Sequence, residues 1–263
     1  MKKPIYLIYH IPKTGGDSVI SFFQSHLDED RDFIFYSAKG LQRLKMAGRP
    51  SLEEREVTDL NRIKAVIGHE VTHRTATFFT NRDCRFSTIL REPVARLTSE
   101  LNYALTQIAK GRHDFFSQLP WVRDREAFHT TLTTEGRLPE SDLRAYVNTL
   151  RQRPGWPDFQ CFWLTVCFPS LAGHTAGDHP SERAKAILDR FWLVGTTNRI
   201  EKYAAILGKA LDLPKFEHHT NKSTKYVSQT ELKAHFKNEM PAHDRILFDY
   251  FAQRFEKASI RFQ

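Results

Sequence analysis

The chain has 263 residues, with 39 Lys and Arg against 31 Asp and Glu, and a formal net charge of +8 at pH 7. Hydrophobic residues make up 40% of it and aromatic residues 12%, which excludes a largely disordered chain and allows a substantial core. The longest segment without Asp, Glu, Lys or Arg, 159–177, contains a proline, two glycines and a histidine, so we expect no membrane span.

Cysteine content and the N-terminal residues both favour a soluble cytoplasmic protein. Three cysteines (Cys84, Cys161 and Cys167) without a C-x-x-C pair are too few for a disulfide framework. The apolar run after Met-Lys-Lys-Pro is five residues long, which is too short for a secretory signal.

The positive charge is evenly divided along the chain, since residues 1–132 carry 20 basic and 16 acidic side chains and residues 133–263 carry 19 and 15. A nucleic-acid-binding protein usually has a concentrated basic stripe instead.

Short apolar runs alternate with amphipathic segments along most of the chain. Strands are predicted at Ile5–His10, Phe33–Ser37, Ala65–Gly68, Phe86–Leu90 and Phe191–Gly195. Helices are predicted at Asp17–Leu27, Leu52–Arg62, Pro93–Ala109, Glu140–Arg151, Ser181–Asp189, Arg199–Leu211, Thr230–Asn238 and Ala242–Lys257.

This alternation predicts an α/β protein in which a parallel sheet of about five strands has helices on both faces. Residues 110–180 contain no convincing strand, so we expect them to form a helical insertion. We interpret residues 1–263 as a single domain that carries this insertion.

The first predicted strand leads into a glycine-containing turn and then a helix. The turn reads Ile-Pro-Lys13-Thr14-Gly15-Gly16-Asp17-Ser18. A strand, a turn and a helix N-terminus together make an anion site, because unpaired backbone N–H groups converge there and the helix dipole favours negative charge. Gly15 and Gly16 allow close approach of a ligand, and Lys13 adds a positive charge. The turn is not a Walker A loop, in which Lys directly follows the second Gly.

A second candidate anion site follows the strand Phe86–Leu90. That strand is followed by Arg91-Glu-Pro93-Val-Ala-Arg96-Leu-Thr-Ser99, with Pro93 at a position typical of the first residue of a helix. An arginine at this place suits recognition of a phosphate, whereas a nucleoside triphosphatase more often has an acidic Mg²⁺ ligand there. The two segments together indicate a ligand with two separate anionic ends.

These two motifs resemble those of the sulfotransferase family. Ile-Pro-Lys13-Thr14-Gly15-Gly16 is similar to the family's 5′-phosphosulfate loop, and Arg91-x-Pro93-x-x-Arg96-x-x-Ser99 is similar to its 3′-phosphate motif. The resemblance is to carbohydrate sulfotransferases of the heparan/uronyl 2-O-sulfotransferase type and their bacterial relatives. Trp192–Glu201 resembles the last core strand with its helix, and Asn221-Lys222-Ser223 resembles the loop that closes over the cofactor.

The resemblance implies a P-loop-NTPase-like fold that uses 3′-phosphoadenosine 5′-phosphosulfate (PAPS) as the sulfuryl donor, with no required metal. The implied acceptor is a hydroxyl, most readily that of a glycan, polysaccharide or glycolipid. The implied PAPS-binding residues are Lys13, Thr14, Gly15, Gly16, Asp17, Ser18, Arg91, Ser99, Asn221, Lys222 and Ser223. Residues 110–180 match least clearly and are the expected acceptor side.

A different motif lies at the end of the third predicted strand. Gly68-His69-Glu70-Val71-Thr72-His73 contains H-E-x-x-H, which on a helix would present two zinc ligands and a general base. The preceding Ala-Val-Ile-Gly indicates the end of a strand instead. In the sulfotransferase interpretation His69 matches the catalytic histidine, and its imidazole takes the acceptor proton. His73 and Arg74 are candidate acceptor-binding residues.

Three classes of function therefore remain open. The first is a PAPS-dependent sulfotransferase with His69 as base and Lys13 beside the leaving group. The second is a zinc hydrolase that uses His69, Glu70 and His73. The third is a non-catalytic protein that binds nucleotides or polyanions. The sequence fixes neither the acceptor nor the oligomeric state.

Overall fold

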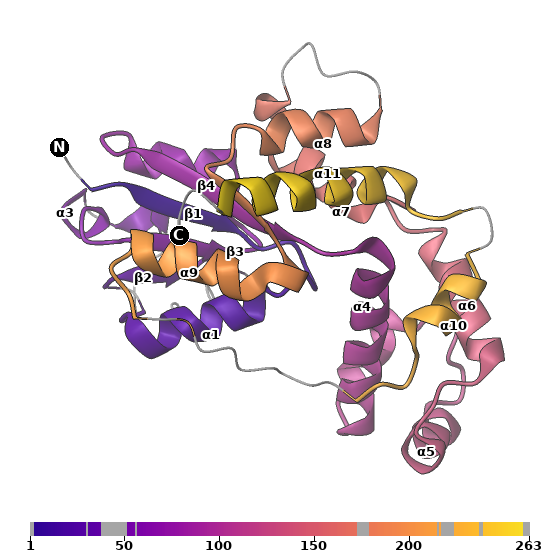
Figure 1. The fold of residues 1–263 in the computed structure, drawn as a ribbon. Helices are drawn as coiled ribbons and strands as arrows, with labels where there is room; N and C mark the ends of the chain where they lie inside the picture. The colour runs from indigo at the N-terminus through magenta and orange to yellow at the C-terminus, as the bar shows by residue number, and fades with distance from the viewer. Residues whose placement is uncertain are drawn as a thin grey trace.

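A computed structural model describes residues 3–29, 31–37, 52–55, 57–172, 179–214, 216, 224–236 and 239–259. Its centre is one sheet of five parallel strands in the order β2-β3-β1-β4-β5 (Figure 1). The strands are β1 (Ile5–Tyr9), β2 (Phe33–Phe35), β3 (Ala65–Gly68), β4 (Cys84–Leu90) and β5 (Leu193–Thr196). The predicted α/β class and all five predicted strands are confirmed.

The strand register brings the carboxyl ends of the strands to one edge of the sheet. Tyr9, the last residue of β1, pairs with Gly68 of β3 and with Thr88 of β4. Near the end of β4, Leu90 pairs with Thr196 of β5. The loops after β1, β3, β4 and β5 therefore leave the sheet side by side, which is where open parallel sheets bind ligands.

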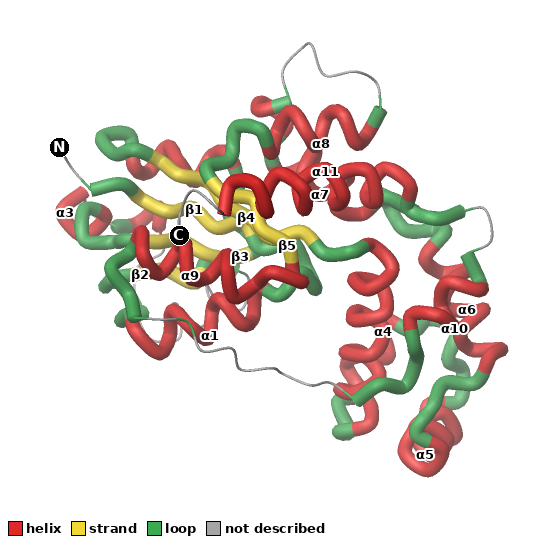
Figure 2. Tube along the Cα trace, viewed as in Figure 1, coloured by secondary structure: helices red, strands yellow, loops and turns green. Residues whose placement is uncertain are grey.

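Helices cover both faces of the sheet, as a parallel sheet requires. Alternate residues of β1 point to opposite faces: Leu7 packs in a cluster with α7 (Phe159–Cys167), α8 (Pro180–Leu188) and α11 (Ala242–Ser259). Ile8 packs in a cluster with α1 (Gly16–His26) and α9 (Ile200–Ala210). Figure 2 shows the strands between these two sets of helices.

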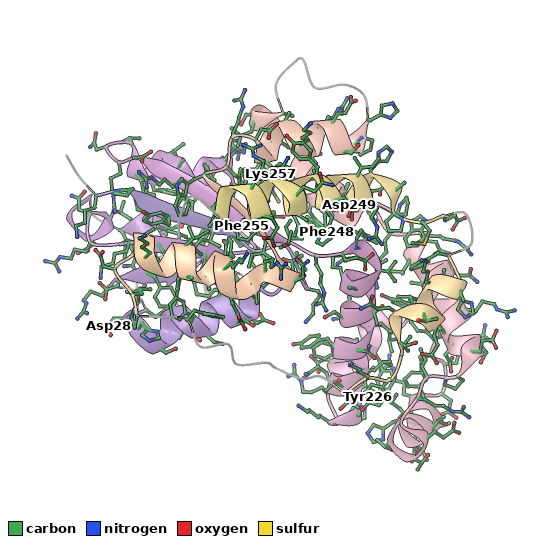
Figure 3. All side chains as sticks on the ribbon, in the orientation of Figure 1. Asp28, Tyr226, Phe248, Asp249, Phe255 and Lys257 are labelled. Atoms are coloured by element: carbon green, nitrogen blue, oxygen red, sulfur yellow. The ribbon has the colours of Figure 1, made fainter. Side chains whose placement is uncertain are left out.

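Helix α11 illustrates how an amphipathic pattern is used at the edge of the sheet beside β5. Phe248 and Phe255 are buried in the two clusters, whereas Asp249 and Lys257 are exposed (Figure 3). This division follows from helical periodicity, which places apolar residues three or four apart on one stripe.

The predicted helical insertion is confirmed for residues 110–172, which contain no strand. Its helical segments are η3 (His113–Gln118), α5 (Arg125–Glu135), α6 (Glu140–Leu150), α7 (Phe159–Cys167) and η4 (Pro169–Leu171). A third apolar cluster joins α5 and α6 to α4 (Pro93–Ala109) and α10 (Gln229–Ala234). In Figure 1, α4 stands between the sheet and the pair α6 and α10.

The prediction of one continuous helix over Leu52–Arg62 is wrong. It forms a short 3-10 turn, η1 (Leu52–Glu54), and a single turn of helix, α3 (Val57–Leu60). The hydroxyl of Tyr36 donates a hydrogen bond to Glu53 over 2.6 Å, which fastens η1 to the end of β2. None of the helices in the described ranges combines the length and the apolar character needed to cross a membrane.

Candidate functional site

The turn between β1 and α1 is built to leave backbone donors open at the helix N-terminus. Thr14 closes the turn, since its backbone N–H and its hydroxyl both donate to the carbonyl of Ile11, over 3.3 and 2.8 Å. Lys13 and Gly15 have positive φ angles of 66° and 90°. Helix α1 then begins at Gly16 without a side-chain cap. The start of α1 therefore receives no side-chain cap from Gly15, and a helix N-terminus of this kind favours an anion.

Gly16 of the turn has no room for a side chain, and the space at Gly15 is tight. A Cβ atom on Gly16 would lie 2.1 Å from Cδ2 of His10, and one on Gly15 would lie 3.0 Å from Cδ1 of Ile200. Gly15 also has the left-handed backbone conformation that glycine adopts at little cost. His10 and Ile200 thus pack directly against the two glycines of the turn.

Arg91, directly after β4, reaches the same turn. Its Nη1 donates a hydrogen bond to the backbone carbonyl of Lys13 over 3.1 Å. Gln160 of α7 fixes the backbone of Arg91 from the other side: its Oε1 accepts the Arg91 N–H over 3.0 Å, and its Nε2 donates to the Arg91 carbonyl over 2.8 Å. The two motifs that the sequence singled out therefore meet at one place, 78 residues apart in the chain.

The two cations of the site are partly removed from water. Burial lowers the pKa of Lys13, and the charge of Arg91 lowers it further, against the opposing effect of Asp17. Burial also lowers the pKa of Arg91, followed by the effect of Arg96. Two partly desolvated positive groups stabilise a bound anion more than exposed ones do, because the Coulomb attraction is less screened.

Tyr103 of α4 holds the Lys13 side chain. Lys13 Nζ lies 3.7 Å from the centre of the Tyr103 ring, which is 39% exposed. Ser99 lies one helical turn before Tyr103, half-buried, and so belongs to the same face of α4. The predicted 3′-phosphate residue Ser99 thus lies on the helix face that Lys13 approaches.

His69 follows β3 and lies against the start of the turn. Its ring stacks on the ring of His10, with centroids 4.3 Å apart, and its Nδ1 is 2.5 Å from the carbonyl oxygen of His10. A carbonyl oxygen only accepts hydrogen bonds, so Nδ1 carries the proton and Nε2 of the neutral ring has a free lone pair. In the neutral, exposed His69 ring, Nε2 is therefore the nitrogen with a lone pair that can accept a proton.

The other predicted site residues take different places. Asp17 is exposed and Ser18 half-buried in the first turn of α1, and Arg74 is exposed on η2 (His73–Phe79). His73 Nδ1 donates to the carbonyl of Cys167 over 3.2 Å, so it joins η2 to α7. Asn221, Lys222 and Ser223 lie outside the described residues.

Arg96, part of the second motif, has a partner within its own helix. It is buried and donates to Glu100 over 3.0 Å, and Glu100 also pairs with Arg153. These two cations keep the pKa of the half-buried Glu100 carboxyl low in spite of its desolvation. Arg96 therefore belongs to an ion cluster within the helical layer.

The H-E-x-x-H motif does not lie on a helix. His69 and Glu70 form a turn directly after β3, and His73 begins the separate 3-10 segment η2. The two histidines therefore do not lie one helical turn apart on the same face, as the zinc interpretation requires. Within the described ranges, no three His, Cys, Asp or Glu side chains are grouped so that they could hold a metal ion.

Three residues of the site carried no usable signal in the sequence. Gln160 acts on Arg91 from 69 residues away through side-chain to backbone hydrogen bonds. The local sequence pattern places His10 at the end of a buried strand, and it indicates that Tyr103 is one of the aromatic residues of an amphipathic helix. A contact between distant segments has no local pattern, so only the fold reveals these partners.

A groove of about 890 Å³ lies away from this edge of the sheet, in the helical layer. Residues of α5, α6 and α10 line it together with the connection between α5 and α6, among them Arg137, Arg144, Arg151, Glu231 and His235. None of its lining residues belongs to the site described above. That residues 110–180 form the acceptor side stays a prediction.

No family model matches the chain, and no curated protein matches it. Among solved structures, the fold is similar to that of a sulfotransferase from Alicyclobacillus acidocaldarius. The two share 12% sequence identity over 95% of this chain and 96% of that chain, with a TM-score of 0.43. At this level of similarity, function has to be argued from the side chains of the site.

Proposed function

We propose that this protein is a sulfotransferase that moves a sulfuryl group from PAPS to a hydroxyl group of an acceptor. The observation that carries the proposal is the hydrogen bond from Arg91 to the carbonyl of Lys13. It joins a helix N-terminus with a lysine to an arginine at the end of the neighbouring strand. One ligand with two anionic ends can therefore contact both.

The residues at this edge suit a donor of that kind. Gly15 and Gly16 form a backbone cradle in which a Cβ atom on Gly16 would clash with the His10 ring, and α1 begins without a side-chain cap. A 5′-phosphosulfate suits this cradle, because helix N-termini bind such groups with backbone N–H groups. A 3′-phosphate suits the guanidinium of Arg91, which offers paired donors, and the hydroxyl of Ser99. When bound, PAPS supplies an activated sulfuryl group on a bisphosphate leaving group.

The residues of the chain would divide the work as follows. Lys13 holds a positive charge beside the oxygen that gains negative charge as the leaving group departs. His69 accepts the acceptor's hydroxyl proton at Nε2, because its Nδ1–H is already donated to the His10 carbonyl. The carbonyl of His10 holds the imidazole in this orientation throughout. The acceptor oxygen forms a bond to sulfur as the bond from sulfur to the bridging oxygen breaks.

An arginine after β4, rather than an acidic residue, supports a reaction that needs no divalent metal. A sulfuryl group carries less negative charge than a phosphoryl group, so the side chains have less charge to neutralise. In this proposal Lys13 and Arg91 provide that positive charge. A glycan, polysaccharide or glycolipid is the acceptor class we propose, since the chain is basic overall and such acceptors are often anionic.

Transfer of radiolabelled sulfate from PAPS to a library of glycans and glycolipids tests the proposal. We expect labelled product with at least one class of hydroxyl acceptor in the absence of added metal. Binding of adenosine 3′,5′-bisphosphate without transfer to any acceptor would favour a non-catalytic nucleotide-binding protein. The absence of both bisphosphate binding and sulfate transfer would contradict the proposal.

A further inference from the structure

We propose that His10 is a positioning residue whose neutral ring holds His69 in the tautomer and orientation of a base; the catalytic part of this inference rests on the proposed function. His10 is the residue between β1 and the Lys13 turn. It is 5% exposed, and it touches His69 through both its ring and its backbone.

Three contacts place His10 between the elements of the site. Its N–H donates to the carbonyl of Gly68 over 3.0 Å, which ties it to the end of β3. Its carbonyl accepts the Nδ1–H of His69, and its ring lies under the His69 ring at an angle of 25° between the planes. The His10 ring also fills the space that a side chain on Gly16 would occupy. The His10 ring is thus held between the base and the anion-binding turn.

The surroundings of the His10 ring favour its neutral form. Its Nδ1 is buried without a hydrogen-bond partner among the described residues. The charged or titratable groups that act on it are His69, stacked on it, and Lys13, three residues along the turn. Both disfavour a second positive charge, and burial lowers the pKa of His10 well below its usual value.

A neutral ring in this place has a specific consequence for the base. When His69 takes a proton it becomes a cation stacked on the uncharged face of His10, and such contacts between a cation and an aromatic face are attractive. A protonated His10 would instead repel it. The same stack keeps Nδ1 of His69 aimed at the His10 carbonyl, so that Nε2 is the atom that faces the acceptor.

The histidine resonances of the protein without ligand test this inference separately from any transfer assay. In ¹⁵N-labelled wild type we expect His69 to carry its proton on Nδ1 in the neutral state, and His10 to stay neutral from pH 8 to pH 5. His26, whose Nδ1 lies 2.9 Å from the carbonyl of Phe22, serves as an internal reference. His69 protonated on Nε2, or His10 titrating in this range, would overturn the proposal.

Two variants separate positioning from simple space filling. His10→Phe keeps an uncharged aromatic face, so we expect the His69 tautomer to persist and kcat to fall less than it does in His10→Ala. His10→Ala removes the stack, so we expect a mixture of His69 tautomers and a fall in kcat of about 10²-fold from misorientation, with a smaller change in KM for PAPS.

The outcomes of these variants also distinguish the inference from the proposed function. An unchanged His69 tautomer in His10→Ala would overturn the role of His10, whatever the transfer activity. The expected tautomer in wild type, with no transfer to any acceptor, would leave the positioning role standing and contradict the sulfotransferase. If His10→Ala does not fold, the wild-type titration and His10→Phe still decide the matter.

Discussion

Arg91 donates a hydrogen bond from Nη1 to the backbone carbonyl of Lys13 over 3.1 Å, although 78 residues separate them in the chain. The bond exists because β1 and β4 are neighbours in the sheet and end at the same edge. It places a guanidinium beside a helix N-terminus and a lysine, in a setting where burial lowers the pKa of both cations. An anionic ligand that bridges them is the simplest means of stabilising both charges.

Loss of Arg91 should weaken nucleotide binding more than it affects folding. For Arg91→Ala we expect adenosine 3′,5′-bisphosphate to bind more weakly by about 1.5–3 kcal/mol, the usual range for hydrogen bonds to charged groups. Calorimetry measures this directly. Arg85→Ala is the matched control, since Arg85 lies at the other end of β4 and pairs with Asp83. Equal losses in the two variants would contradict the assignment.

Loss of His69 should affect turnover and leave donor binding in place. For His69→Ala we expect kcat to fall by about 10²–10⁴-fold, the range for removal of a general base. The dissociation constant for adenosine 3′,5′-bisphosphate should stay within a few-fold of wild type. His26→Ala is the control, because His26 lies at the other end of α1, where its Nδ1 is 2.9 Å from the carbonyl of Phe22. Wild-type turnover in His69→Ala would show that another group takes the proton.

A side chain at Gly16 should displace the Lys13 turn or the His10 ring that packs against it. In Gly16→Ala the new Cβ would lie 2.1 Å from the His10 ring, so that ring or the turn has to move. We expect a loss of stability of about 1–3 kcal/mol, as is usual for overpacking, together with weaker bisphosphate binding. Urea unfolding and calorimetry measure the two effects.

Gly208→Ala is the matched control for this variant. Gly208 lies within α9, and its Cβ would meet no atom closer than 3.5 Å. Alanine there should raise the unfolding free energy by up to about 1 kcal/mol, since glycine is a poor helix former. Full bisphosphate binding by Gly16→Ala would mean that the packing of His10 under the turn has no bearing on the site.

Asp244 gives the stability a pH dependence of known sign. Its buried carboxylate accepts the N–H groups of Gln160 and Cys161 over 2.9 and 2.8 Å, and burial raises its pKa from 3.8 to about 6. The folded protein binds this proton more tightly than the unfolded chain does. The protonated Asp244 carboxyl therefore contributes fully to the free energy of unfolding below about pH 4, and this contribution is lost as the pH rises through about 6. It amounts to at most about 3 kcal/mol at 1.36 kcal/mol per pKa unit.

The variant Asp244→Asn tests whether Asp244 causes this pH dependence of stability. Between pH 4 and pH 7 the unfolding free energy of wild type should fall relative to that of Asp244→Asn, because the amide does not titrate. Urea unfolding at several pH values measures the difference. Asp249→Asn, on the exposed side of the same helix (Figure 3), is the control for the loss of a carboxylate from α11. Parallel profiles for wild type and Asp244→Asn would contradict the assignment.

The sheet could be predicted from the sequence because each strand is a short apolar run between turn residues. Ile5–Tyr9 and Ala65–Gly68 are buried throughout, so nearly every residue of these strands is apolar and the signal is strong. That the Lys13 turn and Arg91 lie close together could be predicted because each follows a strand, and carboxyl ends of parallel strands share an edge. That they bind an anion stays a prediction.

The support of the site could not be predicted, because it comes from distant segments. The amide of Gln160 could not be recognised as the clamp on Arg91, since a buried glutamine in an apolar helix has no distinctive spacing. The stack of His10 on His69 depends on the pairing of β1 with β3 and on the absence of a side chain at Gly16. The prediction for Asn221, Lys222 and Ser223 falls outside the described residues and stays a prediction.

The most direct measurement compares binding of adenosine 3′,5′-bisphosphate with that of adenosine 5′-phosphate to the wild-type protein by calorimetry. If the Lys13 turn and Arg91 hold the two ends of one ligand, the 3′-phosphate should strengthen binding by about 1.5–3 kcal/mol, or roughly 10–150-fold. Equal affinities for the two nucleotides, or no binding of either, would contradict the account.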